Sequence, residues 1–207
     1  YEYVTAMVGN HDRPHYMPGA KIITVKLIAE AKSGRILGVQ AFGEGEVAKR
    51  IDVVAAAITL GGKVSELFDI DFAYAPPYNS PIDNVATAAL AVMNKLAGRL
   101  KGISSLVAKE KIAAGETVFL DVRTPEECKQ QGCLGGCRNI KYIPLGQLRK
   151  RLGELNKDDK IVAFCKISLR GYEAALILGG EDFKNVEVME GGINAWPFEC
   201  DKFEKEP

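Results

Sequence analysis

The second half of the chain alternates short apolar runs with segments of helical spacing, and this alternation restricts the possible folds most strongly. From about residue 104 the order is helical SLVAKEKIAAG, strand-like TVFLDV, a loop from Arg123, strand-like NIKYIPL, helical GQLRKRLGEL, strand-like KIVAFC, helical GYEAALILGG and strand-like VEVME. Strands that alternate with helices favour a parallel sheet with helices on both faces. We therefore predict an α/β domain over residues 102–207.

The first half has a different pattern. Residues 20–42 read as two strands around a Lys-Ser-Gly-Arg turn, which predicts a β-hairpin. Residues 46–60 and 83–96 carry apolar side chains at helical spacing, and a Gly-Gly pair ends the first of these helices. An antiparallel sheet with helices is an α+β arrangement, so we predict a separate domain over residues 1–101. Polar residues 97–105 link it to the second domain.

The stretch FGEGEVA, residues 42–48, places two glycines and Ala48 between a strand and a helix. This spacing superficially matches a dinucleotide-binding fingerprint. Glu44 and Glu46 would repel a pyrophosphate there, and the preceding strand belongs to a hairpin. We therefore predict a simple turn into a helix.

Charge and hydropathy exclude several classes of partner. Lys plus Arg and Asp plus Glu number 27 each, so no net charge favours nucleic acid or an anionic membrane surface. The sequence has no run of about 18 apolar residues and no signal-peptide pattern. We expect a cytoplasmic protein with reduced thiols, whose five cysteines all lie in the second half.

Cys165 follows the apolar run KIVAF, at the sheet edge where ligands of open α/β folds bind. The following loop and the start of the next helix comprise Lys166, Ile167, Ser168, Leu169, Arg170 and Gly171. Backbone N–H groups, a helix N-terminus and two basic side chains near a sulfur atom lower the pKa of a thiol. The combination predicts a nucleophile that needs no histidine base, although a lone cysteine at a strand end is more often a small core residue.

Three motifs in order make the second domain resemble the rhodanese family. FLDVRTPEE resembles the opening signature of that family, Cys165 to Arg170 its six-residue active loop, and EGGINAW its closing Gly-Gly-x-x-x-Trp motif. The resemblance implies that Cys165 takes sulfur from a small sulfane donor, holds it as a persulfide and passes it to a thiol acceptor. It also implies that Arg170 anchors the loop and the anionic donor. Thiosulfate, glutathione persulfide and coenzyme A persulfide remain open as donors.

Loop length separates the chemical alternatives. Cys165 and Arg170 are separated by four residues, whereas the similar cysteine phosphatases and arsenate reductases typically have five. Sulfur transfer is therefore favoured over oxyanion chemistry. A non-catalytic dimerisation module with a sulfur-sensing or sulfur-binding domain remains the non-enzymatic alternative.

The remaining cysteines depart from the family pattern. Where rhodanese-like sequences usually read Gly-His-Ile-Pro-Gly-Ala, this chain reads GCLGGCR. Cys133 and Cys137 are either spare thiols in a substituted turn or resolving thiols for a persulfide on Cys165. With Cys128 they lack a Cys-x2-Cys pair, and the only histidines, His11 and His15, are far away in sequence, so we predict no metal site. The sequence assigns no role to Cys200.

The first domain resembles the dimerisation domain of flavin-dependent pyridine nucleotide-disulfide oxidoreductases. The segments YMPGA, RILGVQ, KRID and YAPPY carry the resemblance, which implies a homodimer formed through this domain. Tyr16 and Tyr74 match two family tyrosines that lie beside the coenzyme A site of the partner subunit, and Tyr78 is a weaker candidate. A phenol there could donate a hydrogen bond to a reacting sulfur atom, or both tyrosines could simply pack at an interface.

Together the two domains resemble the C-terminal portion of coenzyme A disulfide reductase and rhodanese fusions, also described as NADH-dependent persulfide or polysulfide reductases. The resemblance implies FAD, NAD(P)H and coenzyme A for the full-length enzymes. The glycine fingerprints and redox cysteine of their flavin and nucleotide domains do not occur in this sequence. We therefore expect no cofactor bound by this chain alone and regard the chain as part of a longer reductase.

Overall fold

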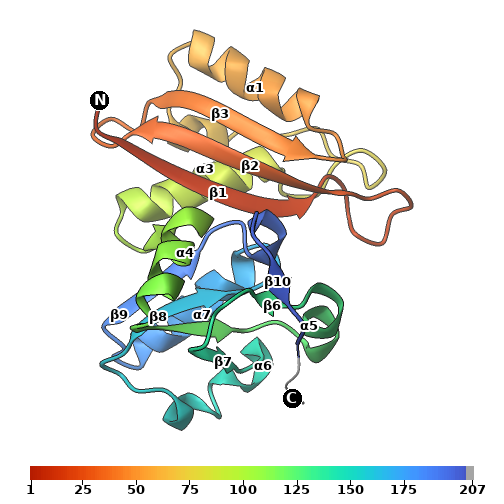
Figure 1. Cartoon of the computed structure of the whole chain (residues 1–207). Coiled ribbons are helices and arrows are strands. Elements are labelled where there is room, and N and C mark those ends of the chain that lie inside the picture. Colours follow the sequence, from red (N-terminus) through yellow and green to blue (C-terminus); the bar gives the residue numbers. More distant parts are fainter. Residues whose placement is uncertain (204–207) are drawn as a thin grey trace. The chain divides into compact units, whose positions relative to one another are not determined.

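The computed structural model describes residues 1–203, and the chain divides into two compact units between Leu100 and Lys101 (Figure 1). Each unit has its own sheet and hydrophobic core. Within the described residues, no helix combines the length and the hydropathy needed to cross a lipid bilayer.

The first unit contains a three-stranded antiparallel sheet. Its strands are β1 (Tyr3–His11), β2 (Ile22–Glu30) and β3 (Ile36–Gly43), with β2 in the centre. Alternate residues of β2, including Val25, Leu27 and Ala29, are fully buried, as expected when one face of a strand covers a core.

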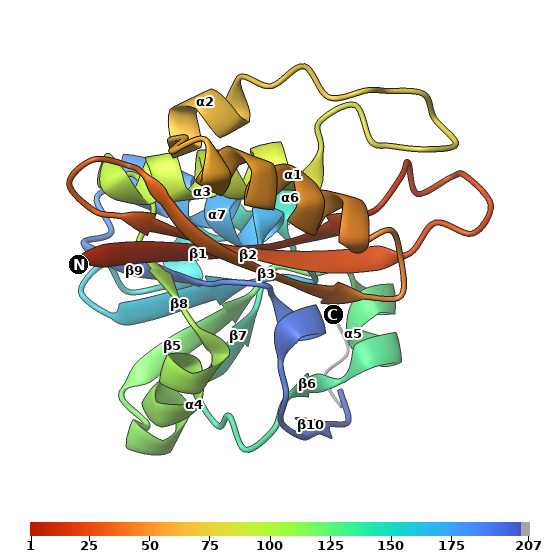
Figure 2. The same ribbon diagram turned by 90° about the horizontal axis from the view of Figure 1, so that it is seen from above.

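Three helices cover this face of the sheet (Figure 2). They are α1 (Ala48–Thr59), α2 (Val64–Phe68) and α3 (Asn84–Leu96). Asp83 sets the start of α3, because its side chain accepts a 2.8 Å hydrogen bond from the Val85 N–H. The core between sheet and helices is aliphatic and includes Val54 and Leu67.

A buried arginine joins the loops at one end of this sheet. Arg50, 1% exposed, donates from Nε to Asp83 Oδ2 at 3.1 Å. Its Nη2 donates at 2.8 Å both to the Asp12 carbonyl oxygen and to Asn79 Oδ1. Because a buried guanidinium must keep its partners, these bonds fix the loop that follows β1 and the loop before α3.

The second unit contains a five-stranded parallel sheet in the order β4, β9, β8, β5, β7. The strands are β4 (Gly102–Ile103), β5 (Thr117–Asp121), β7 (Ile140–Tyr142), β8 (Lys160–Phe164) and β9 (Asn185–Met189). A separate antiparallel pair joins β6 (Cys133–Leu134) to β10 (Cys200–Asp201). One core packs α7 (Leu169–Gly180) and α6 (Leu145–Leu148) on one face, and another packs α4 (Ser105–Ala114) on the opposite face.

The predicted fold classes are confirmed: an antiparallel sheet with helices precedes a parallel sheet with helices on both faces. The turn prediction for FGEGEVA is also confirmed. There, the Asp12 carboxylate accepts the Glu46 N–H at 3.2 Å, and Lys21 pairs with Glu44 at 2.9 Å. The Glu46 N–H, which a phosphate would need, therefore already donates to the Asp12 carboxylate.

The predicted hairpin is confirmed, because β2 and β3 pair antiparallel, and β1 adds a third strand that the sequence did not predict. Other local predictions were wrong. The predicted loop after Arg123 contains α5 (Pro125–Gln131), and the predicted linker contributes β4. The helix predicted over GQLRKRLGEL is only α6, followed by the 3-10 turn η1 (Leu152–Glu154). For α5 a local capping signal was present but was not used, whereas β4 and the short α6 depend on tertiary packing.

Candidate active site

Cys165 directly follows β8 and lies at the carboxyl edge of the parallel sheet. Phe164, the last residue of β8, is paired with Asp121 of β5, and the Val122 N–H donates to the Phe164 carbonyl at 3.1 Å. The Cys165 side chain is 0% exposed and packs in the core with Val122 and Ala174. The predicted position of Cys165 at a strand end is confirmed, and the sulfur lies below the surface of the domain.

A second turn holds the loop that carries Cys165. This turn, residues 191–194, leads into the 3-10 helix η2 (Ile193–Ala195). The Ile193 N–H donates to the Cys165 carbonyl at 2.9 Å, and the Asn194 N–H donates to the Lys166 carbonyl at 3.0 Å. Since C=O and N–H point in opposite directions across a trans peptide, the Lys166 and Ile167 N–H groups point away from this turn.

Gly192 allows the two segments to approach so closely. A Cβ atom at this position would lie 2.5 Å from the Lys166 carbonyl carbon and 2.6 Å from the Ile167 nitrogen. Its φ of 59° also favours glycine. The closing Gly-Gly motif therefore supports the cysteine loop directly.

Arg170, in the first turn of α7, forms a two-pronged ion pair with Glu127 of α5. Nη1 and Nη2 each donate to a different carboxylate oxygen at 2.7 Å. Hydrogen bonding with Glu127 raises the pKa of Arg170, and the nearby Cys165 sulfur contributes to this increase. The arginine therefore anchors the loop to α5 and lies within electrostatic range of the thiol.

The two predicted basic side chains of the loop differ in how they are paired. Arg170 has its carboxylate partner, so Lys166 supplies the remaining cationic side chain of the loop. Burial favours a higher pKa for Glu127, but the hydrogen bonds from Arg170 and the Thr124 N–H, with the nearby Lys166, lower it overall. Glu127 is thus a carboxylate at neutral pH and compensates much of the loop charge.

No role of Glu127 was predicted from the sequence, although a local signal was present. Thr124 and Glu127 form a reciprocal capping box at the start of α5, and Pro125 occupies the first helical position. The same carboxylate therefore caps α5 and holds Arg170. Its position three residues after Thr124 predicts the cap, whereas the contact with Arg170 depends on the tertiary fold.

Beneath this site, Arg123 and Asp121 form a fully buried ion pair at 2.6 Å. Arg123 Nη2 also donates to the Gly132 carbonyl at 2.7 Å, which connects the end of β5 to the end of α5. Burial favours a lower pKa for Arg123, but the bonds to Asp121 raise it overall. Asp121 and Arg123, both part of the FLDVRTPEE signature, therefore hold α5, and with it Glu127, in position.

The other loop residues are distributed between the site and the surface. Ile167 and Ser168 are half-buried, and Gly171 is buried in the first turn of α7. Leu169 is 60% exposed, so an apolar side chain lies at the surface of the loop. Ser168 has a φ of 96° and accepts a 2.5 Å hydrogen bond on Oγ from the Gly191 N–H.

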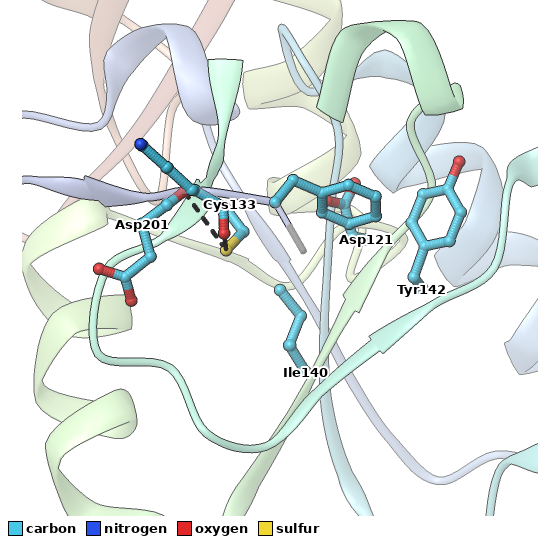
Figure 3. A pocket seen from close by; sticks show the side chains of 7 residues that line it. Asp121, Cys133, Ile140, Tyr142 and Asp201 are labelled. Atoms are coloured by element: carbon cyan, nitrogen blue, oxygen red, sulfur yellow. Dashed lines mark hydrogen bonds between the residues drawn. The ribbon is translucent and has the colours of Figure 1, made fainter. Parts of the chain in front are cut away.

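Cys133 lines a pocket of about 540 Å³ in the second unit, and Cys165 is not among the residues that line it (Figure 3). Its thiol donates to the carbonyl oxygens of Asp201 and Lys202 at 3.6 and 3.8 Å. Tyr142 lines the opposite side of the pocket (Figure 3). Burial raises the pKa of Cys133, and the charge of Asp201 raises it further, so this thiol is protonated and a weak nucleophile at neutral pH.

The remaining cysteines are also free thiols. Burial raises the pKa of Cys128 to about 12 and that of Cys137 to about 11. Cys200 is classed as exposed, yet partial burial of its thiol also raises its pKa. No group of three His, Cys, Asp or Glu side chains suited to a metal ion occurs among residues 1–203. The structure does not bring Cys133 or Cys137 into the hydrogen-bonded loop of Cys165, and their resolving role stays a prediction.

The candidate coenzyme A tyrosines lie in exposed loops of the first unit. Tyr16 is 67% exposed, Tyr74 50% and Tyr78 73%. His15 packs edge-on against Tyr16, with ring centroids 5.7 Å apart. All three phenols are accessible to a molecule or surface outside this unit, as a role at an interface requires.

Comparison with known proteins gives matches in both units. Residues 105–198 match the rhodanese-like domain, and residues 1–86 match the pyridine nucleotide-disulphide oxidoreductase dimerisation domain. A sulfurtransferase of Allochromatium vinosum is 32% identical over 95 residues, which cover 45% of this chain and 85% of that protein.

Longer relatives combine the two domains with further sequence. The structure of an NAD-dependent persulfide reductase from A. fulgidus is 41% identical with a TM-score of 0.85, and the match covers 95% of this chain and 34% of that one. The CoA-dependent NAD(P)H sulfur oxidoreductase of Pyrococcus furiosus is 42% identical over 78 residues, 38% of this chain and 17% of that enzyme. The chain thus spans about a third or less of the length of these reductases.

Proposed function

Because the chain belongs to the rhodanese-like family through its second unit, and its first unit is a pyridine nucleotide-disulphide oxidoreductase dimerisation domain, we propose that it transfers sulfane sulfur through a persulfide on Cys165. The supporting observation is the placement of Cys165. The sulfur lies at the end of a central strand, with the neighbouring carbonyls turned toward residues 191–194 and the guanidinium of Arg170 nearby.

The transfer takes place in two displacements. The Cys165 thiolate attacks the outer sulfur of a donor persulfide, the donor S–S bond breaks, and the donor thiol leaves with the electron pair and a proton. A thiol acceptor then attacks the outer sulfur of the Cys165 persulfide and regenerates the Cys165 thiolate. No net oxidant or reductant is needed, and backbone N–H groups stabilise the negative sulfur in both steps.

In this proposal the chain acts as a portion of a coenzyme A-dependent persulfide reductase. The names of the A. fulgidus and P. furiosus relatives support this class of activity. The exposed phenols of Tyr16 and Tyr74 fit a role at a coenzyme A site on a partner subunit, where they would donate hydrogen bonds to a thiol or thiolate. Flavin and NAD(P)H would supply the reducing electrons in the full-length enzyme.

A direct experiment tests the sulfur carrier. The chain and a Cys165→Ser variant are mixed with glutathione persulfide or thiosulfate, and intact-protein and peptide mass spectrometry locate any added sulfur. In parallel reactions, cyanide or a thiol is added as the sulfur acceptor, and released thiocyanate or sulfide is measured. We expect one added sulfur atom on Cys165 and none in the variant. Release of sulfide or thiocyanate that survives the substitution would contradict the proposal, and added sulfur on Cys133 alone would favour the sensing alternative.

A further inference from the structure

Ser168 adopts a backbone conformation that side chains disfavour. Its φ is 96°, and among residues 1–203 only Ser168 and Asp182 have a positive φ without being glycine. Such conformations carry a conformational cost and persist only where surrounding contacts require them. The loop between β8 and α7 is short, with only residues 165–168 joining strand to helix, so this one residue sets the direction in which the chain enters α7.

The Ser168 side chain makes an unusual choice of partner. A serine before a helix commonly caps it by accepting an N–H from the first turn. Ser168 occupies that position for α7, but its side chain makes no capping bond. Instead, Oγ accepts the Gly191 N–H at 2.5 Å. This side chain therefore does not cap the first N–H groups of α7. Those groups lie at the N-terminus of the helix, where the cysteine loop ends.

This bond completes a series of three between the loop and the supporting turn. The Ile193 and Asn194 N–H groups hold the carbonyls of Cys165 and Lys166, which fixes the first half of the loop. The Ser168 side chain fixes the second half. Of these three bonds it alone depends on a side chain, so a single substitution can remove it without altering the other two.

We propose that Ser168 is a positioning residue, whose Oγ, bonded to the Gly191 N–H, holds the loop in the positive-φ conformation that directs its N–H groups toward the Cys165 sulfur. This inference rests on the proposed function insofar as the positioned sulfur is a persulfide carrier. The held conformation itself does not require that chemistry. A mobile loop would lose N–H donors around the sulfur, which would slow attack on a donor more than it would weaken donor binding.

Two variants separate the hydroxyl from the backbone conformation. Ser168→Ala keeps the disfavoured φ and removes the bond, whereas Ser168→Gly removes the bond and also relieves the disfavoured φ. Ser104→Ala is the matched control, because Ser104 Oγ accepts the Val107 N–H at 3.3 Å at the start of α4 in the same unit. Far-ultraviolet circular dichroism checks that each variant is folded.

Two measurements follow on the full chain. Hydrogen exchange of the peptide spanning residues 165–172 reports on loop mobility, and single-turnover loading of Cys165 by glutathione persulfide reports on chemistry. In both Ser168 variants we expect exchange to accelerate and the maximal loading rate to fall, each by roughly three- to tenfold, the effect of one hydrogen bond. The half-saturating donor concentration should change less than twofold, and Ser104→Ala should match the wild type.

The outcomes distinguish this inference from the proposed function. Wild-type exchange in Ser168→Ala, or wild-type exchange and loading in Ser168→Gly, would overturn the role of the hydroxyl. Accelerated exchange with an unchanged loading rate would overturn its role in the chemistry. If the wild-type chain takes up no sulfur while Ser168→Ala still accelerates exchange, the proposed function fails and the structural role of Ser168 stands.

Discussion

At the scale of single residues, the site depends on how charges around the thiol are paired. Arg170 is the predicted anchor for an anionic donor. Its guanidinium is nevertheless bound to Glu127 through Nη1 and Nη2. The arginine is therefore held in a fixed orientation, and its charge is partly compensated. Lys166 remains as the loop cation that can move toward a donor.

Glu127→Gln tests this arrangement. The amide keeps the size of the side chain but cannot accept two charged hydrogen bonds, so Arg170 loses its fixed orientation. We expect maximal sulfur loading to fall roughly tenfold and the free energy of unfolding to fall by about 1 kcal/mol, since the pair is partly exposed. Glu154→Gln is the control, because it removes an ion pair with Arg151 elsewhere in the unit; equal loading by both variants would contradict the role of Glu127.

The ion pair between Glu127 and Arg170 also predicts a pH dependence. The quantity that should vary is the difference in stability between the wild type and Glu127→Gln. Pairing lowers the pKa of Glu127 below its usual 4.5, despite the opposing effect of burial. The ion pair thus stabilises the folded state above the usual carboxyl pKa and is lost as pH falls through the lowered value. In chemical denaturation, the stability difference between wild type and Glu127→Gln should shrink as pH falls below about 4.

At the scale of elements, the sequence predicted those whose own pattern was strong. KIVAF is continuous and apolar, and it forms the central strand β8. The segment PEECKQQ forms α5 although only Cys128 is buried, so its hydrophobic pattern contained little signal beyond the capping box. The pairing of β6 with β10 joins two-residue strands across more than sixty residues of sequence, and no local pattern could predict it.

The candidate site shows the same division. Cys165 and Arg170 were identifiable from the sequence because they occur together after a strand and before a helix, and the Gly-Gly motif was identifiable from the resemblance to the rhodanese family. The partner of Arg170 and the bonds from residues 191–194 were not, because they depend on how separate elements pack. The sequence therefore predicted the positions of the candidate residues in the fold, but not the contacts that orient them.

Gly192→Ala tests the contact between the supporting turn and the cysteine loop. A methyl group would overlap the backbone of Lys166 and Ile167, and alanine also disfavours the positive φ. Gly136→Ala is the control, since Gly136 has a φ of 73° with no atom within 4 Å of an added Cβ. We expect Gly136→Ala to lower the unfolding free energy by about 1 kcal/mol and Gly192→Ala by about 2–4 kcal/mol. Equal losses in thermal or chemical denaturation would show that the contact is unimportant.

At the scale of the whole molecule, one segment of the first unit is rich in exposed apolar side chains. The segment from Phe68 to Ile82 in the first unit exposes a group of large apolar side chains, between 36% and 73% exposed: Phe68, Ile70, Tyr74, Tyr78 and Ile82. A concentration of exposed apolar side chains in one segment favours a protein interface. The family of this unit is defined by dimerisation, so we expect the chain to form a homodimer through it.

Ile82→Asp tests this expectation against a matched change in the other unit. Ile82 is 62% exposed and Leu106 of α4 is 63% exposed, so an aspartate at either position should be tolerated by the folded chain. In sedimentation equilibrium the wild type should have about twice the 22.5 kDa mass of the chain. A charge buried at the interface should weaken dimerisation at least about tenfold in Ile82→Asp, whereas Leu106→Asp should remain dimeric. A wild-type monomer would contradict the homodimer, and a fully dimeric Ile82→Asp would place the interface elsewhere on the first unit.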